Sequence, residues 1–236
     1  MPISRVGLAV IGDEVLMGEV ADRNIQIIGR EVFRIGADMV YAAVIPDEMD
    51  FMVRHLSWMR EQFDWVVTTG GIGATHDDLT RLAVSRVTGR PLRESAEALR
   101  ALEGRLGTPV PEKVRELAMV PEGAELITNA LTAAPGFIVD NLIVLPGIPK
   151  LVESMMGILD RKLAGGKVLR RTILTMLYES QIAHHLEKVQ AEFPSVKIGS
   201  YPEMGASGHR VRLVLRSRDE KALTGAEKEL LKRMKE

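Results

Sequence analysis

The sequence contains no cysteine among its 236 residues. Disulfides, thiolate metal sites and thiol nucleophiles are therefore excluded, and the absence fits a reducing compartment. No His-Glu-x-x-His zinc motif occurs either. The sequence also lacks an excess of one charge, since 31 Lys and Arg stand against 32 Asp and Glu. No overall field draws the chain to nucleic acid or to an anionic membrane, and we expect neither as a partner.

Long hydrophobic runs are missing as well. The apolar stretch from Val6 to Ile11 is far too short to cross a bilayer and is interrupted at once by Gly12-Asp13-Glu14. We interpret it as the first buried strand of a cytoplasmic protein. The hydrophobic content of 46% allows a substantial core.

Apolar, β-rich segments alternate with amphipathic helical ones as far as residue 160. This pattern predicts an α/β domain over residues 1–165, in which helices cover both faces of a mostly parallel sheet. Two helices are expected, one at Asn24–Ile35 that ends at Gly36 and one that buries Met52, Leu56, Met59 and Phe63. The expected strands are Val6–Ile11, Met39–Ile45, Trp65–Thr69 and Leu142–Leu145, with shorter ones near Leu126 and Ile138.

Gly165 and Gly166 are adjacent and predict a hinge after the first domain. Residues 166–236 follow the order strand, helix, strand, strand, helix, which predicts a small α+β domain of KH-like topology. It contains Gly205-Ala206-Ser207-Gly208, which matches the Gly-x-x-Gly of RNA-binding KH modules as a bare pattern. Because this segment would join two strands and not two helices, we interpret it as a hairpin turn.

The most informative segment is the run from Thr68 to Thr80, in which a β-rich strand leads into a glycine loop and then a helix. Glycines let backbone amides approach an anion, and a helix start adds further unpaired amides. We therefore predict that a phosphate or diphosphate binds here, with the helix beginning at Thr75. The loop lacks the third glycine of a dinucleotide fingerprint and the Gly-Lys-Ser/Thr of a P-loop. The predicted phosphate-binding residues are Gly70, Gly71, Ile72, Gly73 and Thr75.

Acidic residues follow three of the predicted strands. Glu14 comes after the first strand, Asp47 after the second, and Asp77 and Asp78 lie in the glycine loop. Since loops at the carboxyl ends of parallel strands form the binding crevice of an α/β sheet, we expect these acids to converge. A divalent cation between carboxylate and phosphate oxygens, most simply Mg²⁺, would explain them. Each acid has an alternative interpretation as a helix cap.

The chain resembles the molybdopterin-binding-like domain of competence/damage-inducible CinA-like proteins in seven motifs. They are Gly12-Asp13-Glu14-Val15-Leu16-Met17-Gly18, Asp22-Arg23-Asn24, Pro46-Asp47-Glu48, the loop from Thr69 to Thr80, Pro121-Glu122-Gly123-Ala124, Ala134-Pro135-Gly136-Phe137 and Pro146-Gly147-Ile148-Pro149. Segments around Ile198 and Val211 resemble eukaryotic FAD synthases. The sequence contains no counterpart of the deamidase domain that ends full-length CinA proteins.

The resemblance implies a three-layer fold of the MoaB and MogA type and two competing activities. One is a metal-dependent pyrophosphatase that acts on ADP-ribose or FAD; the other binds and adenylylates molybdopterin. In the latter group, functional aspartates match Asp47 and Asp78. The resemblance also implies a homo-oligomer, a dimer or a trimer. The sequence departs from the family at Ala74, Thr132 and Leu151, where proline, glycine and glutamate are usual.

The resulting hypothesis gives each candidate residue a role. Glu14, Asp47, Asp77 and Asp78 are the candidate metal ligands, and Asp47 and Asp78 are also candidate catalytic residues. His76 either protonates the leaving group or hydrogen-bonds the loop. The candidate residues for binding the nucleotide or pterin are Asn24, Asn129, Pro135, Gly136, Pro146 and Gly147. The pterin-binding or adenylyl-transfer module and an inert binding protein remain the alternatives.

Overall fold

The structure, a computed structural model, describes residues 2–129, 131–205 and 208–235. The chain divides into two compact units, residues 1–165 and residues 166–236. Within the described ranges, no helix combines the length and the apolar character that crossing a membrane requires.

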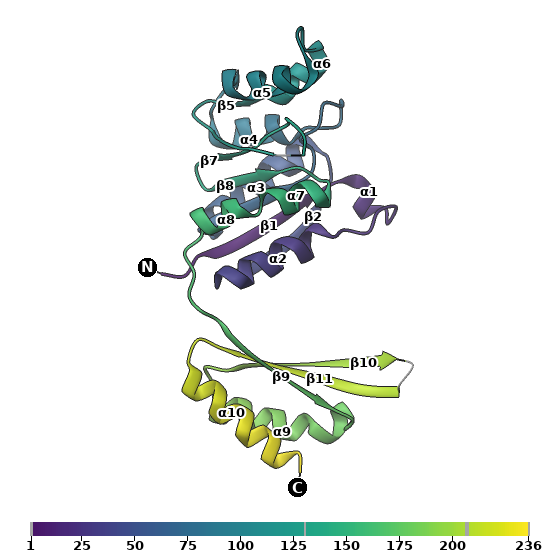
Figure 1. Ribbon diagram of the computed structural model, residues 1–236, viewed down its shortest axis with the longest axis vertical. Coiled ribbons are helices and arrows are strands. Elements are labelled where there is room, and N and C mark those ends of the chain that lie inside the picture. The colour runs from purple at the N-terminus through teal and green to yellow at the C-terminus, as the bar shows by residue number, and fades with distance from the viewer. Residues whose placement is uncertain (1, 130, 206–207, 236) are drawn as a thin grey trace. The chain divides into compact units, whose positions relative to one another are not determined.

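The first unit is built on a six-stranded sheet in the order β2-β1-β3-β8-β7-β6 (Figure 1). The strands β2 (Asp38–Ile45), β1 (Arg5–Ile11), β3 (Trp65–Thr69) and β8 (Leu142–Leu145) are parallel, and β7 (Gly136–Val139) pairs antiparallel with both β8 and β6 (Glu125–Ile127). The predicted mostly parallel sheet is thus confirmed. A two-stranded sheet of β4 (Leu92–Glu94) and β5 (Met119–Pro121) was not expected from the sequence.

Helices cover both faces of this sheet (Figure 1). One face packs against α2 (Asn24–Ile35), α7 (Pro149–Met155) and α8 (Gly157–Lys162), and the other against α3 (Met49–Gln62) and α4 (Thr80–Thr88). Neighbouring residues of β1 alternate between the two cores, since Leu8 belongs to the first and Ala9 to the second. The predicted three layers are therefore present. As predicted, α2 ends at Gly36, which is left-handed with φ 80°.

A smaller apolar cluster surrounds Ala98, Leu102 and Ala118. It is formed by α5 (Ala96–Leu106), α6 (Glu112–Arg115) and the short 3₁₀ helix η1 (Glu116–Ala118). One more short helix, α1 (Asp13–Leu16), directly follows β1.

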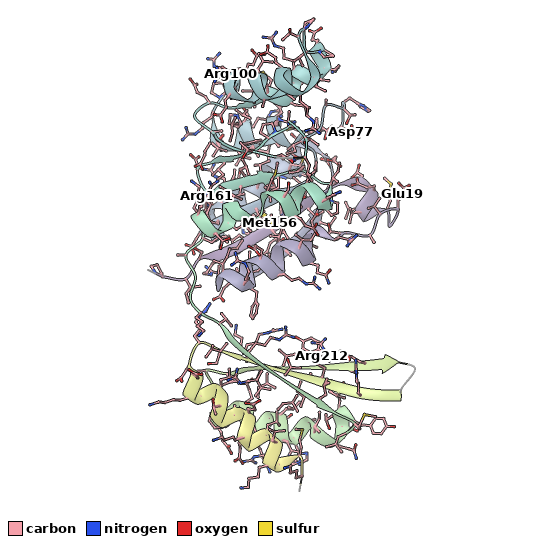
Figure 2. The ribbon with its side chains drawn as sticks, in the orientation of Figure 1. Glu19, Asp77, Arg100, Met156, Arg161 and Arg212 are labelled. Carbon is pink, nitrogen blue, oxygen red and sulfur yellow. The ribbon has the colours of Figure 1, made fainter. Side chains whose placement is uncertain are left out.

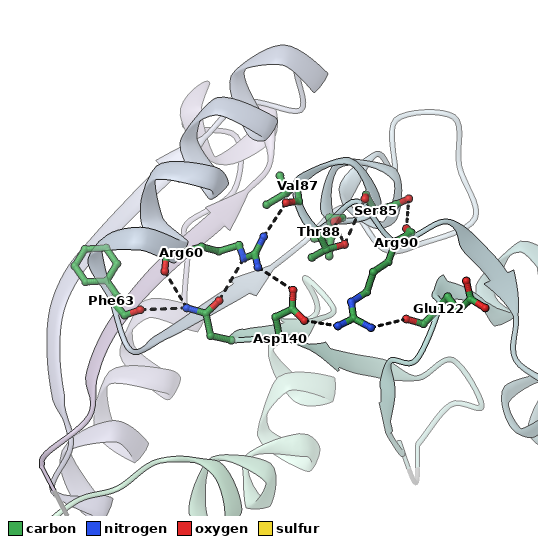
Figure 3. A network of polar contacts seen from close by, with 10 residues as sticks. Arg60, Phe63, Ser85, Val87, Thr88, Arg90, Glu122 and Asp140 are labelled. Carbon is green, nitrogen blue, oxygen red and sulfur yellow. Dashed lines mark hydrogen bonds and ion pairs between the residues drawn. The ribbon is translucent and has the colours of Figure 1, made fainter.

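The turn between β7 and β8 is held by a polar network (Figure 3). The Asp140 carboxylate accepts hydrogen bonds from Arg60 Nη2 at 2.8 Å and Arg90 Nη2 at 2.7 Å. Next to it, Asn141 Nδ2 donates to the carbonyls of Arg60 and Phe63. Because this turn precedes β8, the network stabilises the sheet at the end opposite to the carboxyl ends of its parallel strands.

The second unit has the predicted element order, β9 (Leu169–Thr175), α9 (Glu179–Glu192), β10 (Lys197–Gly205), β11 (Gly208–Ser217) and α10 (Glu220–Arg233). The antiparallel sheet has the order β10-β11-β9 and packs one face on the two helices. Gly205 pairs with Gly208 across β10 and β11, so the Gly-x-x-Gly segment lies in a hairpin as predicted. Its two central residues lie outside the described ranges.

Candidate active site

The loops that follow β1, β2, β3 and β8 meet at the carboxyl ends of the parallel strands. The Gly12 amide donates to the Ile45 carbonyl at 3.2 Å, and the Gly70 amide donates to the Leu145 carbonyl at 3.2 Å. A Cβ atom at Gly147 would lie 3.3 Å from the Gly70 Cα atom. The sequence motifs that were predicted to share one crevice are therefore in contact.

Two glycines shape the loop after β3. Gly70 has φ 103° and Gly71 has φ 62°, a region that favours glycine. A side chain at Gly70 would overlap the carbonyl oxygen of Ile11, and one at Gly71 would overlap Thr80 Oγ1. The loop is fixed on the other side because Ile72 is buried in the core formed with α3 and α4.

The helix after the glycine loop begins at Thr80, and the prediction that it begins at Thr75 was wrong. Residues 75–79 instead form turns, in which the Asp78 amide donates to the Thr75 carbonyl and the Leu79 amide to the Asp77 carbonyl. Thr80 then ties the helix start to the loop, since its amide donates to the Gly71 carbonyl and its hydroxyl to the Gly70 carbonyl, both at 3.0 Å.

The Asp78 carboxylate is hydrogen-bonded to backbone amides of the glycine loop. It accepts a hydrogen bond from the Gly73 amide at 2.6 Å and one from the Thr75 amide at 2.8 Å. The Thr75 hydroxyl donates to the same carboxylate. At the predicted phosphate position the backbone amides therefore bind a carboxylate of the chain itself, that of Asp78.

Asp47 lies against the other side of the glycine loop. Its Oδ1 atom would be 3.4 Å from a Cβ atom at Gly71. Its Oδ2 atom accepts a hydrogen bond from the Asp13 amide at 3.0 Å, and the Asp47 amide donates to Asp13 Oδ1 at 3.4 Å. The loops after β1 and β2 are thus joined through two acidic residues.

Burial raises the pKa of Asp47 above its ordinary value, and the charges of Asp13, Glu14 and Asp77 raise it further, while the hydrogen bond from the Asp13 amide opposes them. Figure 2 shows Asp77 at the same end of the unit as α1. Four acids that come from three loops therefore share one electrostatic environment. The sequence predicts this proximity for Glu14, Asp47 and Asp77, whereas the predicted Asp78 is instead bonded to the amides of Gly73 and Thr75.

His76 and Asp77 point away from the protein. The side chain of His76 is 98% exposed and that of Asp77 66% exposed, with 3.9 Å between His76 Nδ1 and Asp77 Oδ1. The neighbouring Thr75 side chain, followed by a backbone hydrogen bond, holds the pKa of Asp77 below its ordinary value. Asp77 is therefore ionised beside Asp47, and His76 is free to reach a ligand at the surface.

Asn24 connects two loops through hydrogen bonds. It is only 3% exposed, and its Nδ2 atom donates to Thr69 Oγ1 at 2.9 Å and to the Gly147 carbonyl at 2.7 Å. Thr69 Oγ1 in turn donates to the Pro146 carbonyl at 2.7 Å. The amide nitrogen predicted to orient the substrate is thus fully used inside the protein, where it positions the turn of Pro146 and Gly147 against the glycine loop.

Asn129 and Thr132 line a surface cavity of about 330 Å³, with Ala101, Gly104, Arg105 and Ala133. Asn129 Oδ1 accepts from the amides of Leu131 and Thr132, at 2.8 and 3.2 Å. Asn129 Nδ2 and Thr132 Oγ1 have no hydrogen-bond partner among the described residues. Both atoms are buried beneath the surface of this cavity.

Pro135 and Gly136 are buried where β7 begins. A Cβ atom at Gly136 would lie 2.6 Å from the Val144 carbonyl oxygen, so glycine permits the close approach of β7 and β8. The structure gives these two predicted substrate-binding residues a packing role.

No three acidic or histidine side chains among the described residues are grouped tightly enough to hold a metal ion by themselves. The donors that do converge are carboxylates, which are the ligands that Mg²⁺ prefers. Mg²⁺ is commonly held by one or two carboxylates together with substrate phosphates. The residues therefore fit a cation that the substrate helps to bind, and they do not form a closed metal site.

Sequence analysis missed two residues of this region. Asp13, which faces Asp47, lies beside the predicted Glu14 and carries the same signal of an acid after a strand. Arg81 is only 6% exposed although it is charged, and it donates to the Gly73 carbonyl at 2.9 Å. The burial of Arg81 could have been found from its spacing, because it lies three residues before Val84 and so falls on the buried side of α4.

Comparison with known families separates the same two units. A family model described as "Probable molybdopterin binding domain" matches residues 7–164, and one described as "FAD synthase, middle domain" matches residues 167–236. Among solved structures, the protein CinA with unknown function from Thermoplasma acidophilum is 26% identical with a TM-score of 0.62, over 66% of this chain and 97% of that one.

Curated relatives also match this chain over most of its length. A protein from Archaeoglobus fulgidus is 32% identical over 83% of this chain and 84% of its own length. A CinA-like protein from Geobacter sp. is 32% identical over 98% of this chain, and a probable FAD synthase from Caenorhabditis briggsae is 28% identical over 95% of it. The chain spans only 58% and 49% of the lengths of these last two relatives.

Proposed function

The chain belongs to the family of probable molybdopterin-binding domains and has CinA-like relatives, and from this premise we propose that it is a metal-dependent pyrophosphatase. Its substrate would be a nucleoside diphosphate derivative such as ADP-ribose or FAD, which it would split to AMP and a phosphorylated product. The observation that carries the proposal is the position of Asp47, which lies against the glycine loop and within the field of three further acids.

The glycine loop supplies the phosphate-binding half of the site. Backbone amides of Gly73 and Thr75 already bind the carboxylate of Asp78, so their geometry accommodates an oxyanion. The helix α4 begins a few residues later, and the positive end of its dipole favours negative charge. A diphosphate would replace the Asp78 carboxylate at these amides.

The acidic half of the site supplies the metal ligands. Asp47 is the central one, and Asp13, Glu14 and Asp77 are near enough to act on its charge. A divalent cation, once bound, would neutralise phosphate charge and lower the pKa of a water molecule. Without it these acids repel a diphosphate, so the proposal requires activity to depend on the metal.

Asp47 is also the candidate general base. It would take a proton from the attacking water, a role that contributes roughly 10² to 10⁴ in rate. His76, exposed on the same loop, is the candidate that gives a proton to the leaving group.

The nucleoside part of the substrate has a candidate position in the cavity of about 330 Å³ beside α5. Asn129 Nδ2 and Thr132 Oγ1 are buried beside this cavity without a partner among the described residues, and a rotation of either side chain would let it hydrogen-bond a base or ribose. Thr132 stands where glycine is usual in the family, so its hydroxyl would make the substrate preference of this chain differ from that of its relatives.

A second candidate function is binding or adenylylation of molybdopterin without hydrolysis. It is favoured by the match of the molybdopterin-binding model to residues 7–164, which covers nearly all of the first unit. An anion-binding glycine loop and an aspartate at position 47 serve this chemistry equally well, whereas the presence of the second unit favours the pyrophosphatase.

The two functions differ in what they consume. Purified protein is incubated with ADP-ribose, FAD or ATP in the presence of Mg²⁺, with EDTA as the metal-free control, and AMP is measured. AMP from ADP-ribose or FAD that disappears with EDTA supports the pyrophosphatase. Consumption of ATP only when molybdopterin is added supports adenylyl transfer and contradicts the main proposal.

A further inference from the structure

The guanidinium group of Arg81 lies beneath the glycine loop and is incompletely satisfied. Arg81 is the second residue of the nine-residue helix α4 and is 6% exposed. Its Nη1 atom donates to the Gly73 carbonyl at 2.9 Å. Its Nε and Nη2 atoms are buried and have no hydrogen-bond partner among the residues that the structure describes.

A buried arginine in this state is costly for a folded protein. Two acids, Asp78 and Glu116, act on Arg81 from a distance, but no ion pair joins either of them to it within the described ranges. Burial lowers the pKa of Arg81 to about 10, so the group keeps its charge at neutral pH without full compensation. A charge that is retained at such a cost is expected where a ligand compensates it.

Gly73 connects this cation to the oxyanion position of the loop. Its amide donates to the Asp78 carboxylate at 2.6 Å, while its carbonyl accepts from Arg81. The two side chains therefore hold the same residue, one through the anion-binding side of the loop and one from beneath. An anion that replaces the Asp78 carboxylate would take over its electrostatic interaction with Arg81.

We propose that Arg81 forms an anion subsite beneath the glycine loop, in which Nε–H and Nη2–H bind an oxygen of a phosphoryl group. The subsite rests on the proposed function, because its ligand is the diphosphate portion of the substrate. When the diphosphate enters, the Asp78 carboxylate leaves the amides of Gly73 and Thr75, and the segment between them opens enough to uncover the two N–H groups. Arg81 is then a binding residue that neutralises phosphate charge opposite to the acids around Asp47.

Side-chain NMR tests the contact directly. The probe is methylenediphosphonate with Mg²⁺, a diphosphate analogue whose bridging carbon is not hydrolysed. We expect the Arg81 Nε–H resonance and the amides of Gly71 and Gly73 to shift together as the probe is added. Shifts of the loop amides alone would overturn the subsite and leave the proposed site in place. If neither group shifts, the loop is not the phosphate site, and both proposals fall.

Variants give a second test with a matched control. Arg81→Met is expected to weaken binding of the probe about 10- to 100-fold, since a charged hydrogen bond is lost. Its melting temperature should be unchanged or raised, because an uncompensated buried charge is removed. Arg86→Met removes an exposed arginine from the same helix and should leave binding within about twofold.

A merely structural role of Arg81 predicts a different result. Loss of the hydrogen bond to the Gly73 carbonyl would then lower the melting temperature of Arg81→Met and leave the affinity of the folded protein near that of Arg86→Met. Arg81→Lys separates the two roles further, because lysine keeps the charge but not the planar donors. Affinity of Arg81→Lys that equals that of the unmodified chain would contradict binding through Nε and Nη2.

Discussion

The carboxylate of Asp47 accepts a hydrogen bond of 3.0 Å from the backbone amide of Asp13, and the amide of Asp47 donates one of 3.4 Å to the carboxylate of Asp13. This reciprocal pair joins the loops that follow two neighbouring parallel strands. It also fixes two like charges beside each other at the edge of the glycine loop. Burial raises the pKa of Asp47 and the charge of Asp13 adds to this effect, while the hydrogen bond from the Asp13 amide opposes it.

Asp47→Asn should separate activity from stability. The amide oxygen can still accept from the Asp13 amide, but it cannot ligate a cation as a carboxylate does or take a proton. We expect turnover of ADP-ribose or FAD to fall roughly 10² to 10⁴-fold. Since the raised pKa shows that the ionised carboxylate is disfavoured in the folded protein, the melting temperature should stay the same or rise.

The control for this variant is Asp50→Asn, which removes an exposed acid from the first turn of α3. It should leave turnover unchanged and cost little stability. Equal activities of the two variants would remove Asp47 from the mechanism.

The sheet of the first unit could be predicted because its strands are short, apolar and regularly separated by amphipathic helices. The predicted end of the helix at Gly36 was correct because a left-handed glycine is a strong local signal. The start of α4 was misplaced at Thr75 because the Asp78 side chain accepts hydrogen bonds from two backbone amides and so stabilises a turn there. Such a turn and a helix cap use the same residue types.

The proximity of Glu14 and Asp77 to Asp47 could be predicted from topology, since loops at the carboxyl ends of parallel strands meet, but the engagement of Asp78 by the loop amides could not. Nor could the roles of individual residues. Asn24 was predicted to orient the substrate, yet its Nδ2 atom donates to Thr69 and Gly147, which lie 45 and 123 positions away in the chain. Arg81 was missed because burial of a charged side chain depends on which loops cover it.

Gly71→Ala and Gly89→Ala form a pair that tests the glycine loop. Both glycines are left-handed, with φ 62° and φ 67°. A methyl group at Gly89 meets no atom within 4 Å, whereas one at Gly71 overlaps Thr80 Oγ1 and lies 3.4 Å from Asp47 Oδ1. Gly89→Ala should cost only the backbone strain, about 1–2 kcal/mol. Gly71→Ala should cost more and also abolish diphosphate binding, measured by calorimetry after urea denaturation has established the stability of each variant.

Asn24→Ala should destabilise the first unit by about 1–3 kcal/mol, because the buried hydroxyl of Thr69 and the Gly147 carbonyl lose a donor. Asn24→Asp should be worse at neutral pH, since a buried carboxylate would face the Gly147 carbonyl oxygen. Gln26→Ala, an exposed change on the same helix, is the control. Urea unfolding measures all three. If Asn24→Ala loses no more free energy of unfolding than Gln26→Ala, the hydrogen bonds of Asn24 between these loops contribute nothing to stability.

His55 should make stability depend on pH. It lies among aromatic rings, with ring centroids 5.7 Å from Phe51 and 5.5 Å from Trp58, and its Nε2 atom is 3.2 Å from the Tyr41 hydroxyl. Burial lowers its pKa from the ordinary value of 6.5. Below pH 6.5 the unfolded chain therefore takes up the proton before the folded one, so the free energy of unfolding falls as the pH decreases through that range. Above it, His55 is neutral in both states and contributes no slope.

Removal of this imidazole should flatten the profile. The free energy of unfolding of His55→Gln, measured in urea between pH 5 and 8, should decrease less on acidification than that of the unmodified chain. His76→Gln replaces a side chain that is 98% exposed and should follow the unmodified profile. If His55→Gln shows the same acid slope as the unmodified chain, the proton that destabilises the fold binds elsewhere, and the aromatic packing of α3 against β2 does not depend on a neutral His55.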